Sequence, residues 1–190
     1  MNVVYNWLFP AIWIAYLVYW QIAAAGAKST VRLEPALSRL FRIILFMAGI
    51  ALLVLPRFPI PWLYRNFMPF SLWTFWVGAA VTVGGILFAV WARLTIGANW
   101  SRSVTIKQDH ELITTGPYAL VRHPIYTGLL TAFAGTTVAA AQYRDILAFV
   151  LIFLSLWYKL RLEEQWMRSQ FGDSYSDYAR HTAALVPWLL

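Results

Sequence analysis

The chain has 190 residues, of which 61% are hydrophobic and 12% are charged, and it contains no cysteine. A soluble domain of this size carries about 25% charged residues, so the composition predicts an integral membrane protein and excludes disulfides and cysteine-bound metal sites. The formal net charge is +7. Its basic residues stand in loops between apolar runs, which is typical of membrane topology signals and not of nucleic-acid binding.

The first apolar segment, residues 1–27, contains no charged residue. It is long enough for a spanning helix, which needs about 20 residues. Residues 23–27 could also form a signal-peptide cleavage site. However, a signal peptide begins with a positively charged region, and no lysine or arginine precedes this apolar run. We therefore expect a spanning helix that is retained.

Two more spanning helices are expected before the polar centre of the chain. The second should begin near Ala36 and include the uncharged run 43–56, with Arg39 and Arg42 reaching toward the lipid headgroups. The third lies in the uncharged stretch 66–92. It is long enough to cross the bilayer with some tilt.

The fourth and fifth spans follow the polar region 93–122. Pro124 should begin the fourth span, 124–143, because proline suits the first position of a helix. Small residues in it, at Gly128, Ala132 and Gly135, would let another helix approach closely. The fifth apolar run, 146–158, comes so soon afterwards that the two should form a tight hairpin. Its helix should continue past the membrane and stop at Gly172.

The basic residues are distributed unevenly between the two sides of this arrangement. One side receives twelve lysines and arginines: Lys28, Arg32, Arg39, Arg42, Arg93, Arg102, Lys107, Arg122, Lys159, Arg161, Arg168 and Arg180. The other side receives three: Arg57, Arg65 and Arg144. The positive-inside rule then predicts an N-terminus outside and a polar loop and C-terminus in the cytoplasm.

The sequence lacks the glycine fingerprints of nucleotide-binding folds and the His-Glu-x-x-His motif of zinc enzymes, and we expect no metal. One polar constellation remains, which the expected hairpin brings to one membrane face. Its members are His110, Glu111, Tyr118, Arg122, His123, Tyr126, Lys159, Arg161, Glu163 and Glu164. Each has a simpler interpretation, since a His before a Pro is often a helix cap and 159–164 could be a solvated helix end with paired charges. Their joint arrangement favours a functional site.

These residues belong to a longer pattern of motifs along the chain. The pattern comprises Gly-Pro-Tyr (116–118), Arg-His-Pro-x-Tyr-x-Gly (122–128), Glu-Glu (163–164), Phe-Gly-x-x-Tyr-x-x-Tyr (171–178) and Val-Pro (186–187). It resembles the isoprenylcysteine carboxyl methyltransferase family and its prokaryotic relatives, and phospholipid N-methyltransferases share a similar pattern. The family is built of membrane helices and uses S-adenosyl-L-methionine without a Rossmann domain.

The resemblance implies roles for individual residues. Cofactor contacts are implied for His110, Glu111, Leu112, Ile113, Tyr118, His123, Pro124, Ile125, Tyr126 and Glu163. A substrate contact is implied for Lys159, where eukaryotic members have arginine, so the fork that suits a carboxylate is missing here.

The chemistry of S-adenosyl-L-methionine suits this set on physical grounds. Its charged amino-acid end needs a carboxylate and a donor, here Glu163 and His123, and its adenosine needs aromatic walls, here Tyr118 and Tyr126. Methyl transfer to an anion requires alignment and desolvation more than acid–base catalysis. If the acceptor were an amine, His123 or Glu164 would be the candidate base.

We therefore expect an all-α integral membrane protein of about five transmembrane helices, in a prokaryotic cytoplasmic membrane. Residues 1–190 would form a single domain, with three spans in 1–92 and the catalytic loop, spans four and five and a C-terminal helix in 93–190. The expected function is methylation of a lipophilic or lipid acceptor, with His123, Tyr126 and Glu164 as the catalytic candidates. Three alternatives stay open: a phospholipid or amine N-methyltransferase, a sterol-reductase-like NADPH enzyme, and a non-catalytic membrane scaffold.

Overall fold

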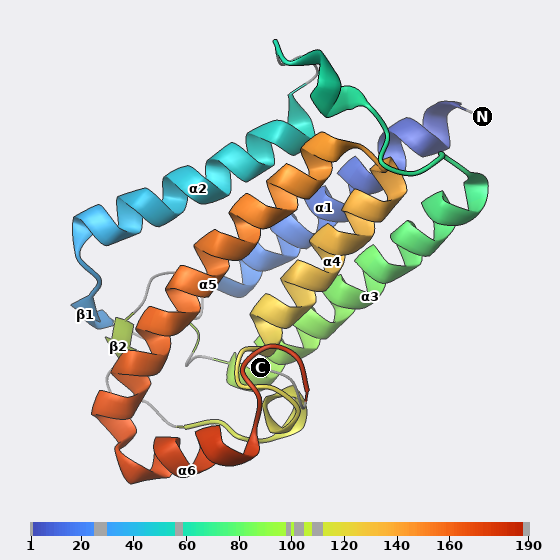
Figure 1. Ribbon diagram of the computed structural model, residues 1–190. Coiled ribbons are helices and arrows are strands. Elements are labelled where there is room, and N and C mark those ends of the chain that lie inside the picture. Colours follow the sequence, from blue (N-terminus) through green and yellow to red (C-terminus); the bar gives the residue numbers. More distant parts are fainter. Residues whose placement is uncertain are drawn as a thin grey trace.

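The computed structural model describes residues 2–24, 30–55, 59–97, 100, 105–107 and 112–187. Five long helices lie side by side, and a short sixth helix turns back at one end of the bundle (Figure 1). The elements are α1 (Asn2–Ala24), β1 (Thr30–Leu33), α2 (Ala36–Val54), η1 (Pro61–Tyr64), α3 (Leu72–Ile96), β2 (Thr105–Lys107), η3 (Gly116–Ala119), α4 (Pro124–Ala140), α5 (Tyr143–Phe171) and α6 (Asp173–His181). The expected all-α class is confirmed, with a small addition: β1 and β2 pair as an antiparallel two-stranded ribbon.

The membrane character of the chain is visible on the outside of the bundle. Within the described residues, α1, α2 and α3 are the helices long and apolar enough to cross a membrane. Large apolar side chains cover their outer faces, among them Leu37, Met47, Trp73, Leu87 and Leu94, all more than half exposed. Such a surface suits lipid and not water. The protein is an integral membrane protein, in which α4 and α5 lie alongside these three helices (Figure 1).

The closest helix contact joins α3 and α4. A methyl group added to Gly85 would lie 2.5 Å from the backbone oxygen of Gly128, and one added to Gly78 would lie 2.5 Å from that of Gly135. Small residues therefore let the two backbones touch, as the sequence predicted for α4. The helix that approaches these small residues closely is α3. The expected hairpin of the fourth and fifth spans is also present, since only Ala141 and Gln142 separate α4 from α5, but its two helices pack less closely.

The other long pair is α2 with α5. Gly49 of α2 faces Ile152 of α5, and the Ser155 hydroxyl donates a 2.8 Å hydrogen bond to the backbone oxygen of Arg42. As predicted, α5 continues beyond its apolar part and ends at Phe171, where Gly172 takes a positive φ of 54° that favours glycine.

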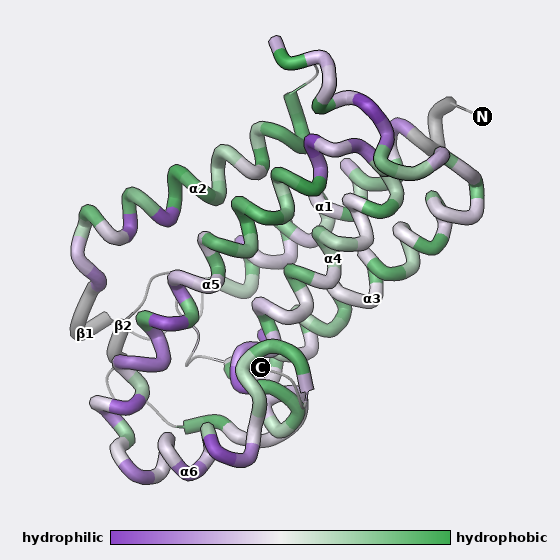
Figure 2. Tube along the Cα trace, in the orientation of Figure 1, coloured by the Kyte–Doolittle hydropathy of each residue, from purple (hydrophilic) through white to green (hydrophobic). Residues whose placement is uncertain are grey.

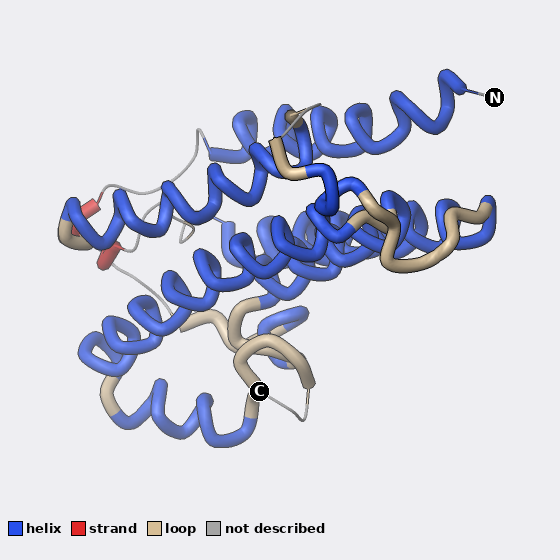
Figure 3. The backbone as a smooth tube through the Cα atoms, turned by 45° about the horizontal axis from the view of Figure 1, so that its top comes forward, coloured by secondary structure: helices blue, strands red, loops and turns tan. Residues whose placement is uncertain are grey.

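The first helix covers the layer formed by α3, α4 and α5 from the side on which α2 also lies (Figure 3). Trp13 stacks on Phe133 of α4 at 4.3 Å between ring centroids and donates a hydrogen bond to Thr136. The third helix begins later than residue 66, because Pro69 precedes it and the Ser71 side chain caps its start by accepting from the Thr74 amide.

Polar residues gather at the two ends of the bundle and apolar residues fill its length (Figure 2). The end at which α4 begins and α5 continues into α6 is the more polar one, and the C-terminal segment returns to it. This end carries the polar constellation predicted from the sequence.

Candidate active site

The site is built around the start of α4. Pro124 occupies the first turn of α4, where its fixed φ suits the helix, and the chain bends at Arg122 before it enters the helix. His123 therefore stands at the N-terminus of α4, and Tyr126 lies one turn further on the same face. Their rings stack in parallel, with centroids 5.5 Å apart and an interplanar angle of 4°.

Glu163 of α5 meets this pair from the neighbouring helix. The Tyr126 hydroxyl lies 2.7 Å from both carboxylate oxygens of Glu163, and Nδ1 of His123 lies 3.7 Å from one of them. Lys159, one turn earlier on α5, places its Nζ 3.7 Å from Glu163 and 5.4 Å from the centre of the Tyr126 ring. These four side chains form one cluster between α4 and α5.

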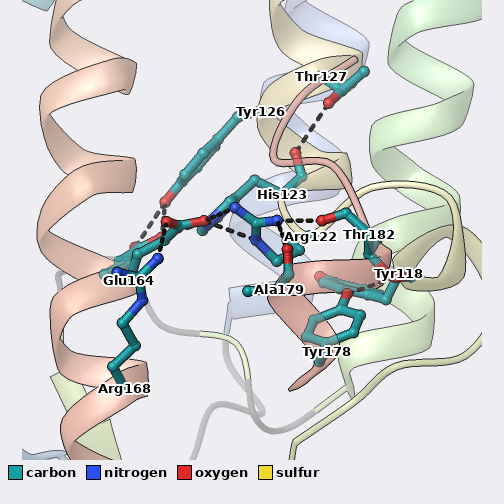
Figure 4. Close-up of polar contacts among 11 residues, drawn as sticks. Tyr118, Arg122, His123, Tyr126, Thr127, Glu164, Arg168, Tyr178, Ala179 and Thr182 are labelled. Atoms are coloured by element: carbon teal, nitrogen blue, oxygen red, sulfur yellow. Dashed lines mark hydrogen bonds and ion pairs between the residues drawn. The ribbon is translucent and has the colours of Figure 1, made fainter. Parts of the chain in front are cut away.

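The adjacent Glu164 points to a different partner. Its Oε1 accepts from Nε and Nη2 of Arg122 at 2.8 and 2.6 Å, and Arg168 lies 3.6 Å from its other oxygen (Figure 4). Nε2 of His123 is 3.5 Å from Glu164, has no hydrogen-bond partner among the described residues, and is buried. The histidine thus lies between the two glutamates, with a nitrogen toward each.

The C-terminal segment closes over the start of α4. Arg122 donates through Nη1 to the backbone oxygens of Ala179 and Thr182 (Figure 4). The backbone amides of Arg122 and His123 donate to the oxygens of Ala183 and Ala184 at 2.8 and 3.0 Å. Residues 121 and 183 pair as a parallel bridge, so main-chain bonds hold residues 121–123 in place.

The surroundings of the ionisable groups in this site shift their pKa values in different directions. Burial opposes ionisation of Glu164, but the nearby His123 ring and the Arg122 guanidinium, which donates two hydrogen bonds, outweigh it and lower the pKa of Glu164 to about 2. Burial, with the nearby carboxylate of Glu163, raises the pKa of Tyr118, so its phenol stays protonated. Burial likewise raises the pKa of Tyr178 to about 12, and its hydroxyl donates to the backbone oxygen of Tyr118.

The structure brings together most of the residues singled out in the sequence. Tyr118 and Ile125 are buried in one apolar cluster, against which Ile113 and Tyr126 pack. Pro124 is fully buried, and Leu112 is partly buried. His110 and Glu111 lie outside the described residues. In the described part of the chain no group of His, Asp and Glu side chains is arranged to hold a metal ion.

Sequence reasoning missed the role of residues 179–185. Their contribution is made by backbone oxygens, which every residue type carries, so no side-chain pattern could indicate it. Tyr178 did have a signal, since it belongs to the 171–178 motif. Arg122 was part of the constellation but had no assigned role, and the structure makes it the link between α5, α6 and the C-terminal segment.

The chain is similar in sequence to several known proteins. A protein described as a probable protein-S-isoprenylcysteine O-methyltransferase in Oryza sativa subsp. indica is 31% identical over 117 residues, covering 60% of this chain and 61% of the relative. The protein-S-isoprenylcysteine O-methyltransferase of Dictyostelium discoideum is 32% identical over 133 residues, covering 66% of this chain and 55% of the relative. This chain thus spans about 60% of the length of the curated relatives it matches.

A solved structure shows the same fold. It is that of the eukaryotic intramembrane Ras methyltransferase, an isoprenylcysteine carboxyl methyltransferase. It aligns with a TM-score of 0.54 at 23% identity, over 80% of this chain and 52% of the other. The sequence also matches the phospholipid methyltransferase family over residues 73–174, more than half of its length. The expected resemblance is confirmed, and the chain belongs to the phospholipid methyltransferase family.

Proposed function

We propose that this protein is a membrane methyltransferase that uses S-adenosyl-L-methionine and methylates a lipophilic acceptor with an anionic head, such as the carboxylate of an isoprenylcysteine-like compound. The observation that carries this proposal is the cluster of His123, Tyr126, Lys159 and Glu163 at the N-terminus of α4. The curated relatives named as isoprenylcysteine O-methyltransferases support the acceptor class.

The residues present fit the methyl donor. The donor carries a cationic amino group and a cationic sulfonium, and the Glu163 carboxylate is the acidic group facing Tyr126 and His123. Its side chain is 23% exposed, so it can be reached while still partly desolvated. The buried Nε2 of His123, without a hydrogen-bond partner in the described residues, offers a contact to the donor's carboxylate or adenosine. Tyr118 and Tyr126 offer apolar, electron-rich faces to a cation.

The reaction requires the protein to align the methyl donor with the acceptor and to exclude water from between them. When bound, the donor supplies a methyl group whose transfer to a carboxylate oxygen forms a C–O bond as the C–S bond breaks, with the electron pair staying on sulfur. No proton has to move for an anionic acceptor. Glu163 and His123 would fix the donor's polar end, and the apolar cluster around Tyr118 and Ile125 would exclude water, which strengthens the attraction between the opposite charges.

Lys159 is proposed to hold the acceptor's anionic head. It follows the apolar run of α5 and is buried, with 11% of its side chain exposed, directly beside Glu163. An apolar tail could then lie among the helices with its head at this depth. An ammonium is a point charge that tolerates several anion shapes. The site is proposed to face the cytoplasm, as the distribution of basic residues predicts.

An N-methyltransferase remains the second candidate, because the family match is to phospholipid methyltransferases. An amine acceptor must lose a proton before or during transfer. With a pKa of about 2, Glu164 is a weak base. His123 is therefore the stronger candidate base for an amine, and Glu164 is proposed to position Arg122 and the C-terminal segment.

The test is a methylation assay in detergent–lipid micelles with labelled S-adenosyl-L-methionine. The acceptors are an N-acylated S-prenylcysteine and, separately, phosphatidylethanolamine. We expect methyl transfer to the acid, little to the amine, and no oxidation of NADPH. In Lys159→Ala the KM for the acid should rise about tenfold while the donor's Kd stays within about threefold, the sign of lost acceptor binding. Transfer to phosphatidylethanolamine alone would reject the carboxylate, and binding of NADPH without the donor would reject a methyltransferase.

A further inference from the structure

A buried ion pair stands at the start of α2, outside the residues that match the family. Glu34 precedes this helix and Arg42 lies two turns into it. Nη2 of Arg42 contacts Oε1 of Glu34, and the side chains are 12% and 0% exposed. Burying two charges is costly unless their remaining hydrogen-bonding groups are also satisfied.

This pair is incompletely satisfied. In the described part of the chain, Nε of Arg42 and Oε2 of Glu34 are buried without a hydrogen-bond partner. A guanidinium presents its donors in a planar fork, and Nε–H with a neighbouring Nη–H is the edge that matches a carboxylate. Arg42 thus has a donor in position for an acceptor group that the described residues do not supply.

Arg42 lies where α2 packs on α5, close to the part of α5 that carries the candidate site. Its backbone oxygen accepts from Ser155, which lies one turn before Lys159 on α5. The neighbouring Phe41 contacts Tyr158, with ring centroids 6.0 Å apart. The charge of Arg42 also interacts with both Lys159 and Tyr126, so these groups share one electrostatic environment.

The charges of this region balance only until the methyl donor binds. Arg42 and Lys159 are offset by Glu34 and Glu163. A donor with one net positive charge that engages Glu163 would leave the region with one excess positive charge. An acceptor with a single negative charge would restore neutrality, whereas a zwitterionic or neutral head would not.

We propose that Arg42 is a second cation of the acceptor site, binding the anionic head group through its guanidinium beside Lys159, while Glu34 holds the guanidinium in place. This inference rests on the proposed methyltransferase function. It gives the acceptor class a physical reason: α2 supplies a directional N–H donor, Nε of Arg42, to complement the point charge of Lys159 on α5. Selectivity for a carboxylate then depends on a helix that precedes the family match.

The experiment compares two arginines that lie at the same end of the bundle. Arg42→Gln removes the proposed contact. Arg180→Gln removes an equal charge from an exposed residue of α6, which pairs only with the exposed Asp177 among the described contacts. Each variant is assayed with an S-prenylcysteine acid as acceptor and with its methyl ester as competitive inhibitor, and donor binding is measured by calorimetry.

We expect Arg42→Gln to raise the KM for the acid about tenfold or more, with the inhibition constant of the uncharged ester and the donor Kd each within about twofold. Arg42→Lys should lie between Arg42→Gln and the wild type, and Arg180→Gln should match the wild type. If Arg42→Gln does not fold, the double variant Glu34→Gln, Arg42→Gln leaves no unpaired charge and should keep the raised KM.

Two results would overturn the inference. In the first, the KM for the acid in Arg42→Gln, or in the double variant, equals that of Arg180→Gln. In the second, acid and ester lose affinity equally, which would make the pair a packing element of α2. Either result leaves the proposed function standing, because both require a wild type that methylates the acid. Failure of the wild type to do so would reject the proposed function first.

Discussion

Glu163 and Glu164 are neighbours in the chain, yet their carboxylates meet different partners. Glu163 faces Tyr126 and Lys159, and Glu164 is held by Arg122. The difference follows from helix geometry, because consecutive residues are turned by about 100° around the axis. At the scale of single residues, Glu163 is therefore the more exposed of the two and is proposed to meet a ligand, while Glu164 is buried in contacts within the protein.

The role of Glu163 can be tested by removing its charge alone. Glu163→Gln should weaken S-adenosyl-L-methionine by about 2 kcal/mol, roughly thirtyfold in Kd, because the group is partly exposed and lies at the lower end of the range for desolvated pairs. Calorimetry in detergent measures this. Asp177→Asn, an equal charge change on the exposed face of α6, should bind normally. Equal affinity in both variants would mean that Glu163 is only the partner of Lys159.

The lowered pKa of Glu164 leads to a prediction about how stability depends on pH. Its pKa is about 2 in the folded protein against an ordinary value of 4.5. The folded state therefore favours the ionised form, and the stabilisation is complete above pH 4.5 and disappears as pH falls toward 2. The apparent unfolding temperature of the wild type should fall across this window, and that of Glu164→Gln should change less.

At neutral pH, Glu164→Gln should cost about 3 kcal/mol, the lower end for a broken buried pair, because Arg122 keeps its carbonyl acceptors. The exposed pair of Arg180 and Asp177 is the control, and Asp177→Asn should cost less than about 1 kcal/mol. A wild type and a Glu164→Gln variant with parallel pH profiles would contradict this account.

At the scale of elements, α3 and α4 form the most closely packed pair of helices in the described part of the chain. Backbone atoms contact each other at Gly78 with Gly135 and at Gly85 with Gly128. Backbone cannot move aside as a flexible side chain can. These contacts hold α4 against α3, and the one at Gly128 lies about one turn after the start of α4, where His123 stands.

Two adjacent glycines provide a matched test of this contact. Gly85→Ala would place a methyl group 2.5 Å from backbone atoms of α4, whereas Gly84→Ala would meet nothing within 4 Å. Gly85→Ala should destabilise the protein by about 1–3 kcal/mol. Gly84→Ala should be neutral or stabilise it by up to about 1 kcal/mol through helix propensity. Thermal unfolding in detergent distinguishes them, and equal effects would argue against the close packing.

At the scale of the whole molecule, one end of the bundle is strongly basic. Arg42, Arg93, Arg122 and Lys159 lie at the end that carries the site, and Arg65 and Arg144 lie at the other. Such an imbalance orients a protein during insertion, because basic loops remain in the cytoplasm.

The corresponding prediction is an N-terminus outside and a C-terminus inside. Each terminus is fused in turn to an enzyme that is active only in the periplasm and to a fluorophore that matures only in the cytoplasm. The fusions before Asn2 should show enzyme activity only, and those after Leu190 should show fluorescence only. Arg65→Gln and Arg144→Gln remove basic residues from the outer side only. Both variants should therefore keep the orientation of the wild type. The same sidedness at both termini would refute the five-helix topology.

The sequence was informative where a local signal existed. Pro124 and Gly172 marked the start of α4 and the end of α5, because each residue has a fixed conformational preference. The partner of α4 could not be read in the same way, since small residues indicate a close approach but not which helix approaches. The ion pair of Glu34 and Arg42 was equally hidden, as its meaning depends on α2 packing against α5.

The backbone bonds between residues 122–123 and 183–184 have an evolutionary consequence. Every amino acid presents a carbonyl, so substitutions in this segment leave the hydrogen bonds intact and are limited mainly by volume, most of all at buried Ala184. Related sequences can therefore drift here while the geometry persists. Side-chain comparisons would underrate the segment, whereas shortening it by a single residue would shift both carbonyls out of register with the amides they serve.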